Sequence, residues 1–248
     1  MNLTEQDRVE KRDEGDTQEP LRPGLSFGAR MWGVLTAPRM TFQDIAQRPT
    51  FWGVLLLQVL AGGVFAWIIS PKLQEFTRLT LEQSGQVMPP DLMQMTMTMV
   101  MVQGILAALI IPPLLWLLQA GLLKLYAQFA LGEGTFRQLF AVAVWSSIPS
   151  LLSGIVHTIL IQMTEAKDFL TVQTSLALFL PASDTISFLY LFLSQFDFFI
   201  IWGLVLLALG AGAVFRQRAT RIGVYLFTLW LIYVVTAAGL GTYFSGKI

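Results

Sequence analysis

The 248-residue sequence contains no cysteine, a single histidine and few charged residues. Without cysteine, disulfide bonds, thiol catalysis, iron–sulfur clusters and cysteine-ligated zinc are excluded. Charged residues make up 13% of the chain, against about 25% in a typical soluble domain. The sequence also lacks HExxH, GxSxG, P-loop and GxGxxG motifs. We therefore expect no enzyme, no metal site, no cofactor and no nucleic-acid partner.

Apolar residues dominate instead, at 54% of the chain, with a mean hydropathy of +0.62. The segment that follows Gly132 is the clearest example, because Leu139 to Met163 carry one His and no Asp, Glu, Lys or Arg. As a helix rising 1.5 Å per residue, this segment would cross the roughly 30 Å hydrocarbon core of a bilayer. The sequence therefore predicts an all-α polytopic membrane protein whose environment is the lipid bilayer.

Five such segments divide the chain after residue 50. In the second of them, Pro112 and Pro113 should kink the helix because they remove two backbone donors. The moderately polar stretch 164–195 leaves no room for another span and its return turn, so we expect amphipathic pieces resting in the interface. The predicted spans are residues 51–70, 97–123, 139–163, 196–215 and 222–244.

The chain before the first span has two parts. Residues 1–24 hold seven acids and four bases without apolar periodicity, which predicts a disordered charged tail and no cleavable leader. Residues 25–36 then have the pattern of a helix lying at the membrane interface. A second short helix should begin at Thr41, with Asp44 completing a capping box, and end before Pro49. We treat residues 25–248 as one membrane domain.

The distribution of Lys and Arg predicts the orientation, because cytoplasmic loops carry an excess of these residues. One side of the predicted topology has eight of them and the other has four. We therefore expect a cytoplasmic N-terminus and a non-cytoplasmic C-terminus, in the inner membrane if the protein is bacterial. The richer side holds Arg30, Arg39, Arg48, Lys124, Arg137, Arg216, Arg218 and Arg221; the poorer side holds Lys72, Arg78, Lys167 and Lys247.

Three stretches resemble the signatures of a known family: VLTAPRMTFQDIAQRP at 34–49, GEGTFRQLFAVAVWSSIPSLL at 132–152 and FDFFIIWGLVLLALG at 196–210. Together they are similar to the Yip family of five-span membrane proteins, in its bacterial form. Eukaryotic relatives are linked to Rab-type GTPases and vesicle traffic through a long cytoplasmic N-terminus, whereas this tail is short and acidic. The resemblance implies a five-span fold more than a defined activity.

The expected function is accordingly a non-enzymatic membrane scaffold or adaptor, with unidentified membrane-protein partners. The alternative is a small transporter or a transporter subunit. Pro112-Pro113 and Asp197 favour this alternative. Against it stand the near absence of charge within the spans and an odd number of spans, which cannot form two equal inverted repeats.

Two polar residues within the spans are candidate site residues. His157 is either a functional group buried in the third span or a neutral imidazole that packs and donates a hydrogen bond. Asp197, at the start of the fourth span, is either part of an ion or proton relay, alone or with His157, or a carboxylate that stabilises a helix N-terminus.

Three further patterns have a structural and a functional interpretation. Ser146, Ser150 and Gly154 recur every fourth residue, which predicts a close helix-packing seam that places the central helix in the middle of the bundle, with a homodimer face as the alternative. The alternating run Met93 to Met101 is either adaptable apolar filler or a soft copper(I) site. The arginines of the predicted cytoplasmic rim mark topology or hold anionic lipid headgroups.

Overall fold

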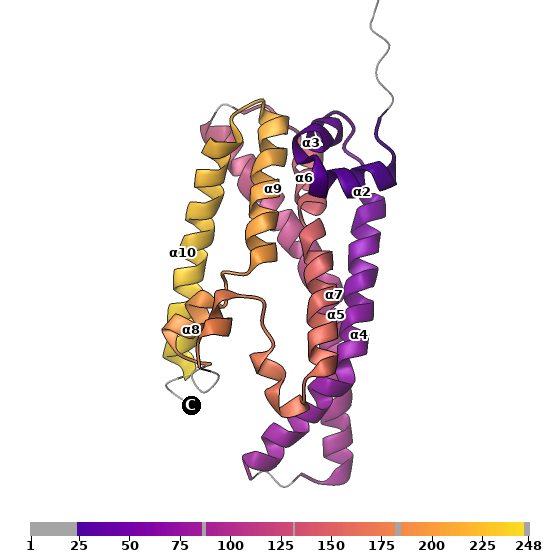
Figure 1. Ribbon diagram of the computed structural model, residues 1–248, viewed down its shortest axis with the longest axis vertical. Coiled ribbons are helices and arrows are strands. Elements are labelled where there is room, and N and C mark those ends of the chain that lie inside the picture. The colour runs from indigo at the N-terminus through magenta and orange to yellow at the C-terminus, as the bar shows by residue number, and fades with distance from the viewer. Residues whose placement is uncertain (1–23, 86–87, 131, 182–184, 246–248) are drawn as a thin grey trace, which may run out of the picture.

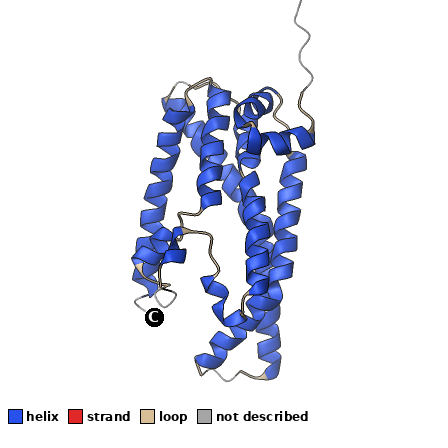
Figure 2. Ribbon diagram, in the orientation of Figure 1, coloured by secondary structure: helices blue, strands red, loops and turns tan. Residues whose placement is uncertain are grey.

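The computed structural model describes residues 24–85, 88–130, 132–181 and 185–245. The tail predicted at 1–24 therefore lies almost wholly outside the described residues. Within them the regular structure is helical (Figure 2), and five segments are long and apolar enough to cross a membrane. This confirms the predicted all-α, five-span architecture. The five segments are α4 (Trp52–Gln83), α5 (Pro90–Phe129), the α6–α7 segment (Phe136–Met163), α9 (Phe198–Phe215) and α10 (Ala219–Ser245).

The third span, made of α6 (Phe136–Ser146) and α7 (Ile148–Met163), stands in the middle of the bundle (Figure 1). α4 and α5 pack on one side of it, and α9, backed by α10, packs on the other. Every residue of α6 from Leu139 to Ser146 is buried. Close approach depends on small residues, since a Cβ atom on Gly210 of α9 would lie 2.5 Å from Val142 Cγ1 and 2.8 Å from Phe42 Cδ1.

The central span is interrupted at Ser147, where α6 ends and α7 begins with Pro149 in its first turn. A break at this depth leaves backbone groups without intrahelical partners, which lipid cannot satisfy. Gln58 of α4 compensates, because its Nε2 donates to the carbonyl of Val144 at 2.8 Å. The Ser147 hydroxyl lies 2.8 Å from the same carbonyl and 2.9 Å from Gln58 Oε1, and can donate to either. This polar junction joins the first span to the third.

The α4–α5 hairpin is longer than a bilayer is thick. At 1.5 Å per residue, the 32 residues of α4 and the 40 of α5 extend about 48 Å and 60 Å, against a hydrocarbon core of about 30 Å. Most of the polar connection predicted between the first two spans is thus helical. Pro71 lies inside α4, and Pro112 and Pro113 lie inside α5. Figure 1 shows the lower part of α4 bending, which is the expected effect of Pro71.

Two short helices, α2 (Phe27–Thr36) and α3 (Pro38–Gln47), precede the first span and lie at one end of the bundle (Figure 1). The predicted capping box is wrong, because α3 begins at Pro38 and not at Thr41. Pro is favoured in the first turn, where its missing N–H has no partner to lose. The hydroxyl of Thr41 donates instead to the carbonyl of Ala37 at 3.0 Å, and Asp44 pairs elsewhere.

The stretch between the third and fourth spans forms short pieces: η1 (Ala166–Thr171), η2 (Leu176–Phe179) and α8 (Phe188–Leu193). α8 packs against α10, so this part of the stretch lies alongside the lower half of α10 (Figure 1). Ser175 pairs with Asp197 in an isolated antiparallel bridge, and the N–H of Leu176 donates to the carbonyl of Phe196 at 3.2 Å. Residues 175 and 176 therefore lie beside the start of α9, although α8 comes between them and α9 in the sequence.

Candidate functional site

Two adjoining cavities open at the end of the bundle that carries α3 and the α9–α10 turn. Their volumes are about 350 Å³ and about 590 Å³, within the usual range of roughly 300–1,000 Å³ for small-molecule sites. They share Gln43, Gly212, Ala213 and Gln217 as lining residues. We call the two cavities together the basic cleft. Its other lining residues are Arg39, Leu209, Arg218, Ala219 and Thr220 in the smaller cavity, and Ala46, Gln47, Gln138, Val214 and Arg216 in the larger one.

The α3 wall of the basic cleft is fixed by a buried ion pair. Arg30 of α2 donates from Nε to Asp44 Oδ2 at 2.7 Å and from Nη1 to the Thr50 hydroxyl at 2.6 Å. The two charged side chains are only 5% and 17% exposed. Charge-assisted hydrogen bonds of this kind are short and directional. α2, α3 and the start of α4 are thereby held in one arrangement.

α3 is also attached to the centre of the bundle. Its Phe42 and Ile45 are fully buried in the core, and the carbonyl of Ala46 accepts from Gln138 Nε2 of α6 at 2.8 Å. Gln138 completes a capping box with Thr135 at the start of α6. The polar face of α3 with Arg39 and Gln43 is therefore displayed over a rigid support.

The opposite wall is the tight turn between α9 and α10. Arg216 ends α9 in the left-handed region, with φ of 53°, a conformation that costs a non-glycine residue some strain. Gln217 holds the turn, because its Nε2 donates to the Ala130 carbonyl at 3.1 Å and its Oε1 accepts from the Tyr126 hydroxyl at 3.2 Å. A Cβ atom on Gly212 would lie 3.1 Å from the Gln217 carbonyl oxygen, so Gly212 lets the turn close over α9.

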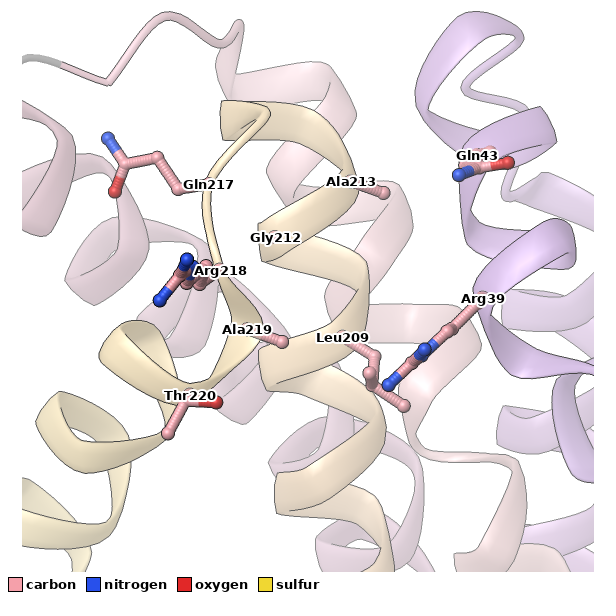
Figure 3. A pocket seen from close by; sticks show the side chains of 9 residues that line it. All are labelled: Arg39, Gln43, Leu209, Gly212, Ala213, Gln217, Arg218, Ala219 and Thr220. Atoms are coloured by element: carbon pink, nitrogen blue, oxygen red, sulfur yellow. The ribbon is translucent and has the colours of Figure 1, made fainter.

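The chemistry of the basic cleft is that of hydrogen-bond donors and positive charge. Arg39 reaches from α3 toward Leu209 of α9, while Arg218 and Thr220 lie on the other side of α9 (Figure 3). In the described part of the chain, no Asp or Glu is among the residues that line either cavity. Arg39, Arg216 and Arg218 are exposed and make no ion pair there. The basic cleft can therefore accept an anion.

The sequence of this domain has known relatives. The family model described as "Yip1 domain" matches residues 32–240. The chain belongs to the Yip1 family. It is similar to the membrane protein YknW of Bacillus subtilis strain 168, with 25% identity over 235 residues that cover 91% of this chain and 93% of YknW. No solved structure matches it. The family resemblance found in the sequence is confirmed, and the chain is an integral multi-pass membrane protein.

The two polar residues predicted within the spans lie outside the basic cleft of this Yip1 domain. Asp197 is the N-cap of α9, where its Oδ1 accepts from the backbone N–H of Phe199 at 2.8 Å and of Ile200 at 3.2 Å. Its Oδ2 accepts from the hydroxyl of Thr174. The hydrogen bonds of His157 go to Ser153, one turn earlier in α7. The hydrogen bonds of Asp197 and His157 therefore go to residues near each of them, and none of these bonds joins the two side chains.

The predicted seam is divided by the break in the central span of the Yip1 domain. Ser146 is 2% exposed, and its hydroxyl donates to the Ala143 carbonyl at 2.9 Å. Gly154 lies against Phe65 of α4, whose ring would be 2.6 Å from an added Cβ atom. Ser150, after the interruption at Ser147, is exposed. The three residues therefore do not form one contact surface.

The methionine run follows one edge of the Yip1 domain on α5. Met93, Met97 and Met101 are half-buried, whereas Met95 and Met99 are exposed. Gln74 of α4 donates from Nε2 to the Met97 carbonyl at 3.0 Å, so the half-buried positions lie along α4. Among the described residues, no three His, Asp or Glu side chains gather as metal ligands. The arrangement along α4 fits apolar packing.

Sequence reasoning missed the polar contacts that position the Yip1 basic cleft. The sequence pattern indicates a topology signal for Arg30 and a helix cap for Asp44, although together they form the ion pair between α2 and α3. Gln58 lies in an apolar run that gives no sign of its partner. A single carboxamide within a predicted span is itself a signal, because burying an unpaired amide in lipid is costly.

We predict that Asp44→Asn destabilises the Yip1 domain by about 3–5 kcal/mol, because it leaves the Arg30 charge buried without its partner. The measurement is the free energy of unfolding in detergent micelles.

The matched control is Glu82→Gln, which breaks the exposed pair between Arg78 Nε and Glu82 Oε1, 3.6 Å apart on α4. Its expected cost is below about 0.5 kcal/mol. Equal effects of the two substitutions would show that the Arg30–Asp44 pair does not fix α3.

Proposed function

We propose that this Yip1 domain is a non-enzymatic membrane scaffold or adaptor that presents a docking surface to other membrane proteins. The observation that carries the proposal is the α4–α5 hairpin, whose 40-residue α5 extends about 60 Å. It therefore extends beyond a bilayer. Met95, just before the predicted span, and Met99, at its start, are left free for contact at 54% and 49% exposure.

The polar groups within the spans support this function over transport. His157 and Asp197 are the only His, Asp, Glu, Lys or Arg residues in the five predicted spans, and each bonds to nearby groups. Gln58 is likewise engaged with Val144. Transport pathways in membranes are lined by ionisable and polar groups that face a cavity. His157 instead bonds within α7 and Asp197 caps α9, while Gln58 joins α4 to α6.

The proposal includes an orientation. The end of the bundle with α2, α3, the α5–α6 connection and the α9–α10 turn holds eight of the chain's sixteen Lys and Arg residues. By the positive-inside rule this end faces the cytoplasm, which places the tip of the α4–α5 hairpin on the opposite side of a bacterial inner membrane. The scaffold would then meet its partners outside the cytoplasm.

The scaffold is tested by photo-cross-linking from α5 in native membranes. A photoreactive amino acid replaces Met95 or Met99 on the exposed side, or Met97 on the half-buried side along α4. We expect one partner protein, of the same mass, from positions 95 and 99 and not from 97.

A flux assay in proteoliposomes tests the alternative function, transport. Saturable proton or cation flux that falls in Asp197→Asn would support a transporter and contradict the scaffold. Asn caps a helix about as well as Asp, so this variant removes the charge while it keeps α9 intact.

The orientation is tested by cysteine labelling, for which the cysteine-free chain is suited. Gln83→Cys, exposed at the end of α4, should react with a membrane-impermeant maleimide in intact cells. Glu133→Cys, exposed between α5 and α6, should react only after the membrane is opened. The reverse pattern would overturn the orientation.

A further inference from the structure

The basic cleft combines positive charge with an open, partly apolar wall. Arg39 and Arg218 both line the 350 Å³ cavity, and Arg216 lines the adjoining one. Between the arginines the α9 surface carries only the small residues Gly212 and Ala213, with Leu209 below. Small side chains at these positions leave the space between α3 and the α9–α10 turn unfilled. The result is an opening with cationic sides and a nonpolar floor.

The charges of the basic cleft are not compensated within the described chain. Arg30 has Asp44 as its partner, whereas Arg39, Arg216 and Arg218 have none among the described residues. Figure 3 shows Arg39 and Arg218 on opposite sides of α9, so an anion over Gly212 and Ala213 would lie between two positive charges. Guanidinium groups bind the oxygens of phosphate in a bidentate manner.

Neutral hydrogen-bond donors in the basic cleft could also bind the oxygens of a phosphate group. The carboxamide of Gln43 and the hydroxyl of Thr220 line the smaller cavity beside the arginines, and both can bond the oxygens of a phosphate ester or an attached hydroxyl. α10 begins at Ala219 in the cavity wall, so the positive end of its helix dipole adds to the field of the arginines. Trp32 of α2 and Met40 of α3 are about 70% exposed, as expected for side chains that anchor this end in lipid.

We propose that the basic cleft is a binding site for a phosphate-bearing anion, with Arg39 and Arg218 as its principal ligands and Arg216, Gln43 and Thr220 as secondary ones. A phosphodiester lipid headgroup and a soluble phosphate ester share this chemistry. The site is additional to the scaffold function and does not depend on it, since it lies at the other end of the molecule from the hairpin tip.

The test measures binding to the full-length protein in detergent micelles by native mass spectrometry. Dioleoylphosphatidylglycerol, which is anionic, is compared with zwitterionic dioleoylphosphatidylcholine. The wild-type protein should bind phosphatidylglycerol more tightly, and Arg39→Gln with Arg218→Gln should weaken that binding at least about tenfold. Arg39→Lys with Arg218→Lys keeps the charge but not the bidentate geometry and should give an intermediate affinity.

The matched control is Arg137→Gln with Arg221→Gln, which removes the same charge from exposed arginines that line neither cavity. It should change the affinity less than about twofold, with unaltered melting temperatures in all variants. Equal weakening by both pairs of substitutions, or equal binding of the two lipids by the wild-type protein, would overturn the site.

Competition identifies the source of the phosphate. Displacement of phosphatidylglycerol by millimolar glycerol 3-phosphate or inorganic phosphate would show that the site accepts a soluble anion. Binding of the intact lipid that neither compound displaces would show a lipid headgroup site. Both results support the anion site, provided that Arg39→Gln with Arg218→Gln abolishes the preference.

Discussion

The fold depends on the polar junction at the centre of the bundle, where Gln58 satisfies the backbone of a broken helix. Lipid offers no hydrogen bonds, so a break within a span persists only where protein groups pair the freed carbonyl. Gln58 Nε2 and the Ser147 hydroxyl both reach the Val144 carbonyl. On the two sides of the break the neighbours differ: α6 packs on α3, α5 and α9, whereas α7 packs on α4 and α9.

This division of the central span also explains where the basic cleft forms. α6 is buried from Leu139 to Ser146, and its first turn carries Gln138, which fixes α3 through the Ala46 carbonyl. α9 packs on the same support, and the small residues at its end leave an opening toward α3. The rigid centre of the bundle therefore ends in a cationic surface, whereas the α4–α5 hairpin continues past the opposite end. The proposed anion site and the proposed docking surface therefore lie at opposite ends of the molecule.

Sequence reasoning predicted the five-span architecture, because long apolar runs are a local property of the chain. It also assigned the family from stretches around Pro38, Gly132 and Phe196, and the match of the family model to residues 32–240 confirms that assignment. It did not predict the pairing of Arg30 with Asp44 or of Gln58 with Val144, because these contacts join residues 14 and 86 positions apart. The predicted capping box is wrong for a different, local reason. Pro38 is compatible both with the end of α2 and with the first turn of α3.

The most direct test of this account is the unfolding free energy of Gln58→Leu in detergent micelles. Leu is more compatible with lipid than Gln, but it leaves the Val144 carbonyl without the carboxamide donor, so we predict a loss of about 1–2 kcal/mol. Gln162→Leu, which removes a similar bond to the Ile68 carbonyl at an exposed position, should cost less than about 0.5 kcal/mol. A Gln58→Leu protein as stable as the wild type would contradict the central role of the junction.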